Sequence, residues 1–99
     1  MPTLLPENQI GERLSQFPRW KLEGKALVKR LSFTSFKEAV AFVNRVAEVA
    51  ERIDHHPDII INYDRVTLYL WTHDTGGVTN RDFQLVELVE ELKPTRCEF

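Results

Sequence analysis

The most regular pattern in the sequence is an apolar stripe with helical spacing in the middle of the chain. Apolar residues recur at intervals of three and four: Phe36, Ala39, Val40, Val43, Val46, Ala47, Ala50 and Ile53. This spacing predicts one amphipathic helix of about five turns. Ser35 and Glu38 match a capping box at its start. Because Pro57 disfavours helix at the residue before it, we expect the helix to end by about Asp54 or His55.

Two shorter helices are predicted near the two ends of the chain. The first runs from Pro6 to Leu14, with Ile10 and Leu14 on one side. The second begins at Thr79-Asn80-Arg81-Asp82, which resembles a capping box with Asp in place of Glu. We expect Pro94 to end it. Its apolar positions form two neighbouring rows, Phe83, Val86 and Val89, and Leu85, Leu88 and Leu92.

Short runs of aliphatic and aromatic residues predict two hairpins, one on each side of the long helix. In the first hairpin, Trp20–Leu22 and Ala26–Phe33 flank a turn at Gly24. One face of its second strand carries Leu27, Lys29, Leu31 and Phe33. Since a lysine interrupts this apolar face, we expect the strand to be half exposed.

The second hairpin joins Ile59–Tyr63 to Val66–His73 through Asp64-Arg65. If those two residues form the loop, the pairing places His56 opposite the histidine that ends the second strand, with Cβ atoms about 4.5 to 5.5 Å apart. In an extended chain the preceding His55 would point the other way. Both would reach one pocket only if the backbone turns at the junction between helix and strand.

The order of predicted elements, α-β-β-α-β-β-α with short connections, defines the expected fold class. It favours an α+β fold in which a four-stranded antiparallel sheet has three helices packed on one face. With 99 residues and 42% hydrophobic content, the chain forms one core, and we expect a single domain over residues 1–99.

Charge and cysteine content exclude several classes of protein. The 13 basic and 15 acidic residues are interspersed and give a net charge of −2, so no concentrated basic face is available for direct nucleic-acid binding. Cys97 is the single cysteine, which excludes an intrachain disulfide and fits a reducing cytosol. No targeting segment is visible, and no apolar run approaches the roughly 20 residues that span a bilayer. We therefore expect a cytoplasmic protein with no membrane contact.

The candidate chemistry lies in one middle segment that holds all three histidines, His55, His56 and His73. Imidazole titrates near neutrality and can both give and take a proton, so the cluster predicts proton-transfer chemistry. Simpler explanations compete with this one. A histidine at the end of a helix or strand often only bonds to backbone, and Asp82 is expected from helix capping alone. Glu51, four residues before His55, could simply pair with that histidine on the helix surface.

Zinc is the weaker alternative for the histidines. Three imidazoles and a water would satisfy a catalytic zinc site. Adjacent His55 and His56 are awkward ligands for one ion, however, and the helical His-x-x-x-His spacing is missing. We expect no metal.

Four motifs follow one another through the middle and the end of the chain: Glu51-x-x-x-His55-His56-Pro57, Tyr63, Thr72-His73-Asp74 and Gly76-Gly77-x-Thr79-x-Arg81-Asp82. Taken together, they resemble the pterin-4a-carbinolamine dehydratase family, and the resemblance extends from Trp20 to Leu92. Many members carry an aromatic residue just after His-His-Pro, where this chain has Ile59 and Ile60.

The resemblance implies an enzyme that dehydrates 4a-hydroxytetrahydropterin to quinonoid dihydropterin and water, in the recycling of tetrahydrobiopterin. Such an enzyme binds a pterin and needs neither a redox cofactor nor a metal. The family pattern gives His55 and His73 the acid and base steps and His56 the orientation of the pterin. Because the strand pairing instead couples His56 with His73, the division of roles stays open. The other residues expected to bind or orient the substrate are Asp82, Glu51, Thr72 and Asp74.

The resemblance also implies partners. Family members form dimers or tetramers, partly by joining sheet edges and partly by packing helices, so we expect a homodimer or homotetramer. A second function of a different class is a protein-binding module, because some relatives act as dimerisation cofactors or transcriptional coactivators that bind a helical segment of a protein partner. A third is a pterin-binding protein outside hydroxylase recycling. The retained histidines favour the enzyme.

Overall fold

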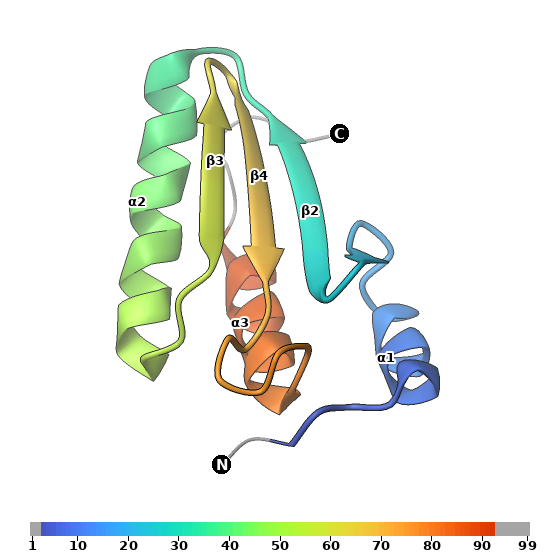
Figure 1. Cartoon of the computed structure of the whole chain (residues 1–99). Helices are drawn as coiled ribbons and strands as arrows, with labels where there is room; N and C mark the ends of the chain where they lie inside the picture. The colour runs from blue at the N-terminus through green and yellow to red at the C-terminus, as the bar shows by residue number, and fades with distance from the viewer. Residues whose placement is uncertain (1–2, 93–99) are drawn as a thin grey trace.

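The computed structural model describes residues 3–92 and confirms the predicted class and order of elements (Figure 1). Pro94 and Cys97 lie outside the described residues. In the part described, no helix has the length and apolar character to cross a membrane. The elements are α1 (Glu7–Leu14), β1 (Lys21–Glu23), β2 (Ala26–Ser32), α2 (Phe36–Ile53), β3 (Asp58–Asn62), β4 (Arg65–Leu70) and α3 (Asn80–Glu91).

The four strands form one antiparallel sheet in the order β1-β2-β4-β3. Each hairpin supplies one edge strand, and the two hairpins meet where β2 pairs with β4, for example at Leu31 and Val66. Helices α2 and α3 cover one face of the sheet, and α1 lies near the end of the sheet where β2 begins (Figure 1). The start of β3 and the end of β4 lie at the same end of the sheet as the last turn of α2 and the first turn of α3 (Figure 1).

The hydrophobic core fills the space between this face of the sheet and the helices. Burying each large aliphatic or aromatic side chain contributes roughly 1.5 to 3 kcal/mol, so the central layer dominates the stability of the fold. The fully buried side chains of that layer include Leu27, Leu31, Val66, Leu68, Leu70, Val46, Phe83 and Val86.

The long helix begins and ends as its sequence predicts. Ser35 accepts a hydrogen bond from the backbone N–H of Glu38 at 3.1 Å. At the other end Asp54 takes the left-handed conformation, with φ of 54°, and the N–H of His55 donates to the carbonyl of Ala50 at 3.1 Å. This turn is a helix C-cap, and it delivers the two adjacent histidines directly into the next strand.

The predicted register of the second hairpin is wrong by two residues. Asn62 pairs with Arg65, so the loop is Tyr63-Asp64, with Tyr63 at φ of 56°. The predicted pairing of His56 with His73 is therefore wrong as well, and both lie outside the strands. A two-residue shift leaves every side chain on the same face, so the hydrophobic pattern could not distinguish the registers. In the observed register the turn also bonds to the end of β2: the N–H of Phe33 donates to the carbonyl of Asp64, at 2.8 Å.

The expectation that β2 is half exposed is also wrong. Every residue from Ala26 to Lys29 is buried, and Lys29 keeps only 6% of its surface. Its ammonium group forms an ion pair with Glu90 of α3, which also accepts a hydrogen bond from the Trp20 indole at 2.9 Å. From the sequence alone, a lysine on an apolar face is predicted to be exposed, because its ion-pair partner lies far away in the sequence.

Candidate active site

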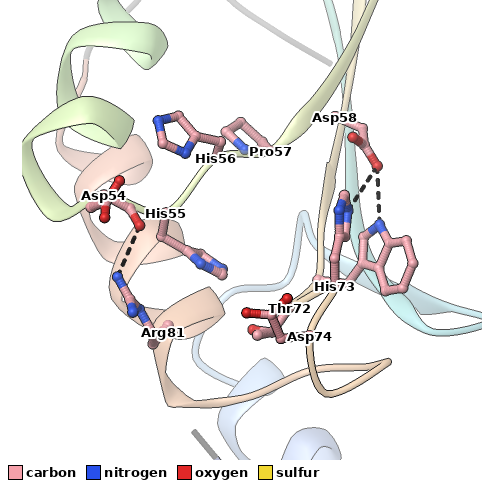
Figure 2. Close-up of a pocket in the computed structure, with 10 residues that line it drawn as sticks. Asp54, His55, His56, Pro57, Asp58, Thr72, His73, Asp74 and Arg81 are labelled. Atoms are coloured by element: carbon pink, nitrogen blue, oxygen red, sulfur yellow. Dashed lines mark hydrogen bonds and ion pairs between the residues drawn. The ribbon is translucent and has the colours of Figure 1, made fainter. Parts of the chain in front are cut away.

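A pocket of about 370 Å³ lies at the end of the sheet, between the α2–β3 junction and the loop that follows β4 (Figure 2). We call it the histidine pocket. Two other hollows on the described surface are as large, about 430 and 440 Å³, but no histidine lines either of them. Chemistry rather than size therefore singles out this pocket. Its lining residues are Asp54, His55, His56, Pro57, Asp58, Trp71, Thr72, His73, Asp74 and Arg81.

The left-handed turn at Asp54 brings both adjacent histidines to the pocket wall. His55 turns inward and is 9% exposed, whereas His56 lies at the surface. Nε2 of His56 lies 2.8 Å from Glu51 Oε2, across the last turn of α2. The expected surface pair of Glu51 with His55 is therefore wrong: Glu51 pairs with His56, and His55 turns to a partner in the interior.

That partner is Asp82, which is fully buried at the start of α3. Its Oδ1 lies 2.7 Å from Nε2 of His55. Its Oδ2 accepts hydrogen bonds from the backbone N–H of Thr79 at 2.8 Å and from the hydroxyl of Thr72 at 2.9 Å. The capping box predicted for Asp82 is present. One carboxylate thus caps α3 and also holds a histidine of the pocket.

The buried carboxylate fixes which nitrogen of His55 carries the proton. A carboxylate with these donors only accepts, so Nε2 of His55 must donate to Asp82. In the neutral ring Nδ1 is then a free acceptor. Among the described residues Nδ1 has no hydrogen-bond partner. In this arrangement Nδ1 of His55 is chemically able to accept a proton.

His73 lies on a tight loop after β4. The N–H of Thr72 donates to the carbonyl of Gly77, and the N–H of Gly76 donates to the carbonyl of Thr72, each at 2.8 Å. Gly76 has φ of 80°, a conformation that glycine adopts without strain. The loop presents His73 and Asp74 at the mouth of the pocket, both exposed. Thr72 remains buried beside Asp82, so its hydroxyl supports the network rather than the surface.

The rim of the pocket contains residues to which the sequence analysis gave no role. Asp58 Oδ2 lies 3.5 Å from Nε2 of His73 and accepts a hydrogen bond from the Trp71 indole at 3.0 Å (Figure 2). Arg81 donates from Nη2 to the carbonyls of Ile53 and Asp54, at 2.7 and 3.0 Å. Helix ends leave such carbonyls without partners, so a basic residue in the family motif could have been expected there. No comparable signal marked Asp58 or Trp71.

Between residues 3 and 92, no three His, Cys, Asp or Glu side chains come together in an arrangement that could hold a metal ion. In this part of the chain, the three carboxylates that face a histidine are engaged with imidazole, indole or hydroxyl groups: Glu51, Asp58 and Asp82.

Comparison with known proteins gives consistent results. The family model described as pterin 4 alpha carbinolamine dehydratase matches residues 3–92. A protein of Thermomicrobium roseum named "Putative pterin-4-alpha-carbinolamine dehydratase" is 50% identical over 89% of this chain and 95% of its own length. A protein of Acidobacterium capsulatum with the same name is 51% identical over 93% of this chain and 99% of its own length.

Solved structures share the fold. The crystal structure of a transcriptional coactivator/pterin dehydratase from Brucella melitensis has a TM-score of 0.83 and 31% identity, covering 90% of this chain and 97% of that one. A pterin dehydratase-like protein identified as a RuBisCO assembly factor has a TM-score of 0.58 and 23% identity, covering 74% of this chain and 84% of its own. The second likeness concerns the fold alone.

Fold and site define a small α+β protein in which one histidine is held by a buried carboxylate and another lies at the rim of the same pocket. The family match and the relatives specify this class further. The chain belongs to the pterin-4a-carbinolamine dehydratase family.

Proposed function

We propose that this protein dehydrates 4a-hydroxytetrahydropterin to quinonoid dihydropterin, as a hydro-lyase in tetrahydrobiopterin recycling. The reaction breaks the bond between C4a and its hydroxyl and removes the proton from N5. The C4a=N5 double bond forms, and the hydroxyl leaves as water. No oxidant or reductant takes part, so the reaction needs an acid and a base in one pocket.

The observation that carries the proposal is the hydrogen bond between Asp82 and His55. It holds the imidazole with its proton on Nε2, so Nδ1 is available as the general base for N5–H. His73, across the same pocket, is the general acid that protonates the leaving hydroxyl. A positioned acid or base of this kind contributes about 10²- to 10⁴-fold to a rate.

The remaining residues of the site bind or position the substrate in this proposal. His56 and Asp74 lie at the exposed mouth and orient the pterin. Asp82 and Thr72 are buried and act through His55, and Glu51 acts through His56. A volume of about 370 Å³ falls in the range of small-molecule pockets, roughly 300 to 1,000 Å³.

We further propose that the protein is cytoplasmic and forms a homodimer or homotetramer. The edge strands β1 and β3 are unpaired on one side among the described residues, and β3 carries Ile60, which is 46% exposed. Exposed edges of this kind pair with other strands unless they are covered. Light scattering coupled to size exclusion tests the oligomeric state, and a monomer at every concentration would contradict it.

A second function is favoured by one observation, the Brucella structure, which is named a transcriptional coactivator as well as a pterin dehydratase. In that function the protein would bind a helical segment of a protein partner. The two functions are compatible, because a partner helix would need an apolar face and the reaction needs the histidine pocket.

The test is the dehydration of freshly generated 4a-hydroxytetrahydropterin, followed by absorbance in stopped flow against the uncatalysed reaction. We expect the wild type to accelerate it and His55→Ala and His73→Ala to lose most of the acceleration while staying folded. A folded wild type without acceleration would contradict the enzyme and leave the protein-binding function.

A further inference from the structure

The acid of the proposed reaction lies in an exposed position, which raises the question of what holds it there. His73 has a side chain that is 55% exposed, and the loop that carries it contains two glycines. An unrestrained exposed imidazole exchanges between rotamers, and fixing it in one of them costs conformational entropy. A general acid must nevertheless be within hydrogen-bond reach of the leaving group.

Two neighbouring side chains restrain His73 on different sides. The Trp71 indole lies two residues earlier on the same side of the chain, with ring centroids 4.1 Å apart and planes inclined by 50°. Asp58, at the start of β3, places Oδ2 3.5 Å from Nε2 of His73. Figure 2 shows the contact of Asp58 with His73 at the pocket wall opposite His55.

The three side chains form one connected unit, which we call the rim triad: Asp58, Trp71 and His73. The Trp71 N–H donates to the same Oδ2 that faces His73, at 3.0 Å, so the indole anchors the carboxylate as well as packing on the imidazole. The triad joins the first residue of β3 to the segment just after β4. Asp58 pairs with Tyr69 in the sheet register, which brings these two segments together.

We propose that Asp58 and Trp71 are positioning residues for His73, holding its Nε2 side against the carboxylate and leaving Nδ1 for the substrate. Among residues 3–92, Nδ1 of His73 has no hydrogen-bond partner, and no hydrogen bond or ion pair joins His73 to the other charged groups of the pocket, Asp54, Asp74 and Arg81. The role of the triad in catalysis rests on the proposed dehydration, but the positioning can be measured without a substrate.

The variants separate the two contacts. Asp58→Asn keeps an oxygen that can accept from the indole and removes the charge that faces His73. Trp71→Phe keeps an aromatic ring against the imidazole and removes the N–H that anchors Asp58. Glu48→Gln, an exposed residue on α2, is the matched control for the loss of one negative charge.

The first measurement is tryptophan fluorescence of the full chain as the pH is raised from 5 to 8. Imidazoles ordinarily titrate in this range, and a protonated imidazole in contact with an indole quenches its emission, so we expect emission to rise with pH. The rise should be absent in His73→Gln and Trp71→Phe, which assigns it to this pair. Asp58→Asn should reduce its amplitude by at least half, whereas Glu48→Gln should leave it unchanged.

The second measurement is steady-state kinetics of the dehydration. A half-exposed ion pair contributes at most about 1 kcal/mol, which corresponds to roughly a fivefold change in rate. We expect kcat to fall three- to fivefold in Asp58→Asn and in Trp71→Phe, with KM changed less than twofold. The double variant should be no slower than the slower single variant, because both act through His73.

The outcomes separate the two proposals. If Asp58→Asn matches Glu48→Gln in both quenching and kcat, the positioning role is overturned, even if Asp58→Asn lowers the melting temperature. If the wild type does not accelerate dehydration but quenching depends on Asp58, the proposed reaction is overturned and the positioning role stands.

Discussion

Two histidines of one pocket are held in opposite ways. His55 is 9% exposed and bonds to a carboxylate that is fully buried, which in turn accepts two further hydrogen bonds. His73 lies at the rim, with both its own side chain and that of Asp58 more than half exposed. The inner histidine is fixed by the folded core, whereas the outer one is held by surface contacts.

The difference has an energetic consequence. Buried carboxylates without their partners cost several kcal/mol, so the fold itself enforces the geometry around Asp82. Exposed ion pairs contribute about 0 to 1 kcal/mol and are weakened by salt. We therefore expect changes on the inner side to affect stability and turnover together, and changes on the rim to affect turnover alone.

The largest effect is expected from Asp82→Asn. If the amide oxygen takes over the bonds to Thr72 and Thr79, its NH₂ group faces His55 and forces the proton onto Nδ1, the atom that must be free in the proposed mechanism. We expect kcat to fall about 10³-fold and the free energy of unfolding to fall by about 1 to 3 kcal/mol. Stopped-flow rates and urea denaturation measure the two effects.

The matched control for this variant is His55→Gln. Because Asp82 acts through His55 in the proposed mechanism, the double variant should be no slower than the slower single variant. If kcat in Asp82→Asn stays within tenfold of the wild type, the buried carboxylate has no role in catalysis, and the proposed role of the inner histidine is contradicted.

His73→Gln should give the next largest effect. We expect kcat to fall about 10²-fold, at the lower end for loss of a general acid, because solvent at the exposed rim partly replaces it. The free energy of unfolding should change by less than about 0.5 kcal/mol, as for other exposed substitutions. A loss of stability as large as that of Asp82→Asn would contradict the division into a buried and an exposed half.

The same division explains what the sequence could predict. The helix at 36–53 follows from its apolar spacing and capping box, and its end follows from Pro57, because these signals are local. The proposed site residues, which were named from the family motif, all lie in or directly beside the histidine pocket. The contact of Asp82 with His55 spans 27 positions, and no local pattern encodes it.

The errors share one physical cause, which is that a polar residue's partner is set by tertiary packing. Lys29 was predicted to be exposed, but its ion pair with Glu90 of α3 lets it be buried. The hairpin register differs by a shift that preserves the alternation, so only the turn at Tyr63 distinguishes it. Asp58 and Trp71 meet because the two strands pair, and neither has a sequence signal of its own.

A smaller effect is expected at His56 and its partner. His56→Gln should raise KM several-fold with kcat changed little, since a residue that only orients the pterin contributes to binding. Glu51 has a side chain that is 77% exposed, so Glu51→Gln should change KM less than about twofold. Initial rates over a range of pterin concentrations measure both. A fall in kcat for His56→Gln comparable to that of His73→Gln would assign it a proton-transfer role and reverse the division of labour.

The smallest effect is expected far from the pocket, at the exposed pair of Glu23 and Arg30. The hydrogen bonds from Arg30, at 2.7 and 3.1 Å, lower the pKa of the Glu23 carboxyl from its usual value of 4.5. A carboxyl with a lowered pKa in the folded state stabilises the protein above its unfolded pKa and loses that contribution as the pH falls through the folded one. Glu23→Gln should therefore lower the melting temperature slightly at pH 7 and not at pH 2 to 3, with kcat unchanged at pH 7. Thermal unfolding at both pH values measures this difference. An equal shift of the melting temperature at both pH values would show that the substitution acts through packing rather than charge. A change in kcat would contradict the proposal that the residues controlling turnover lie in the histidine pocket.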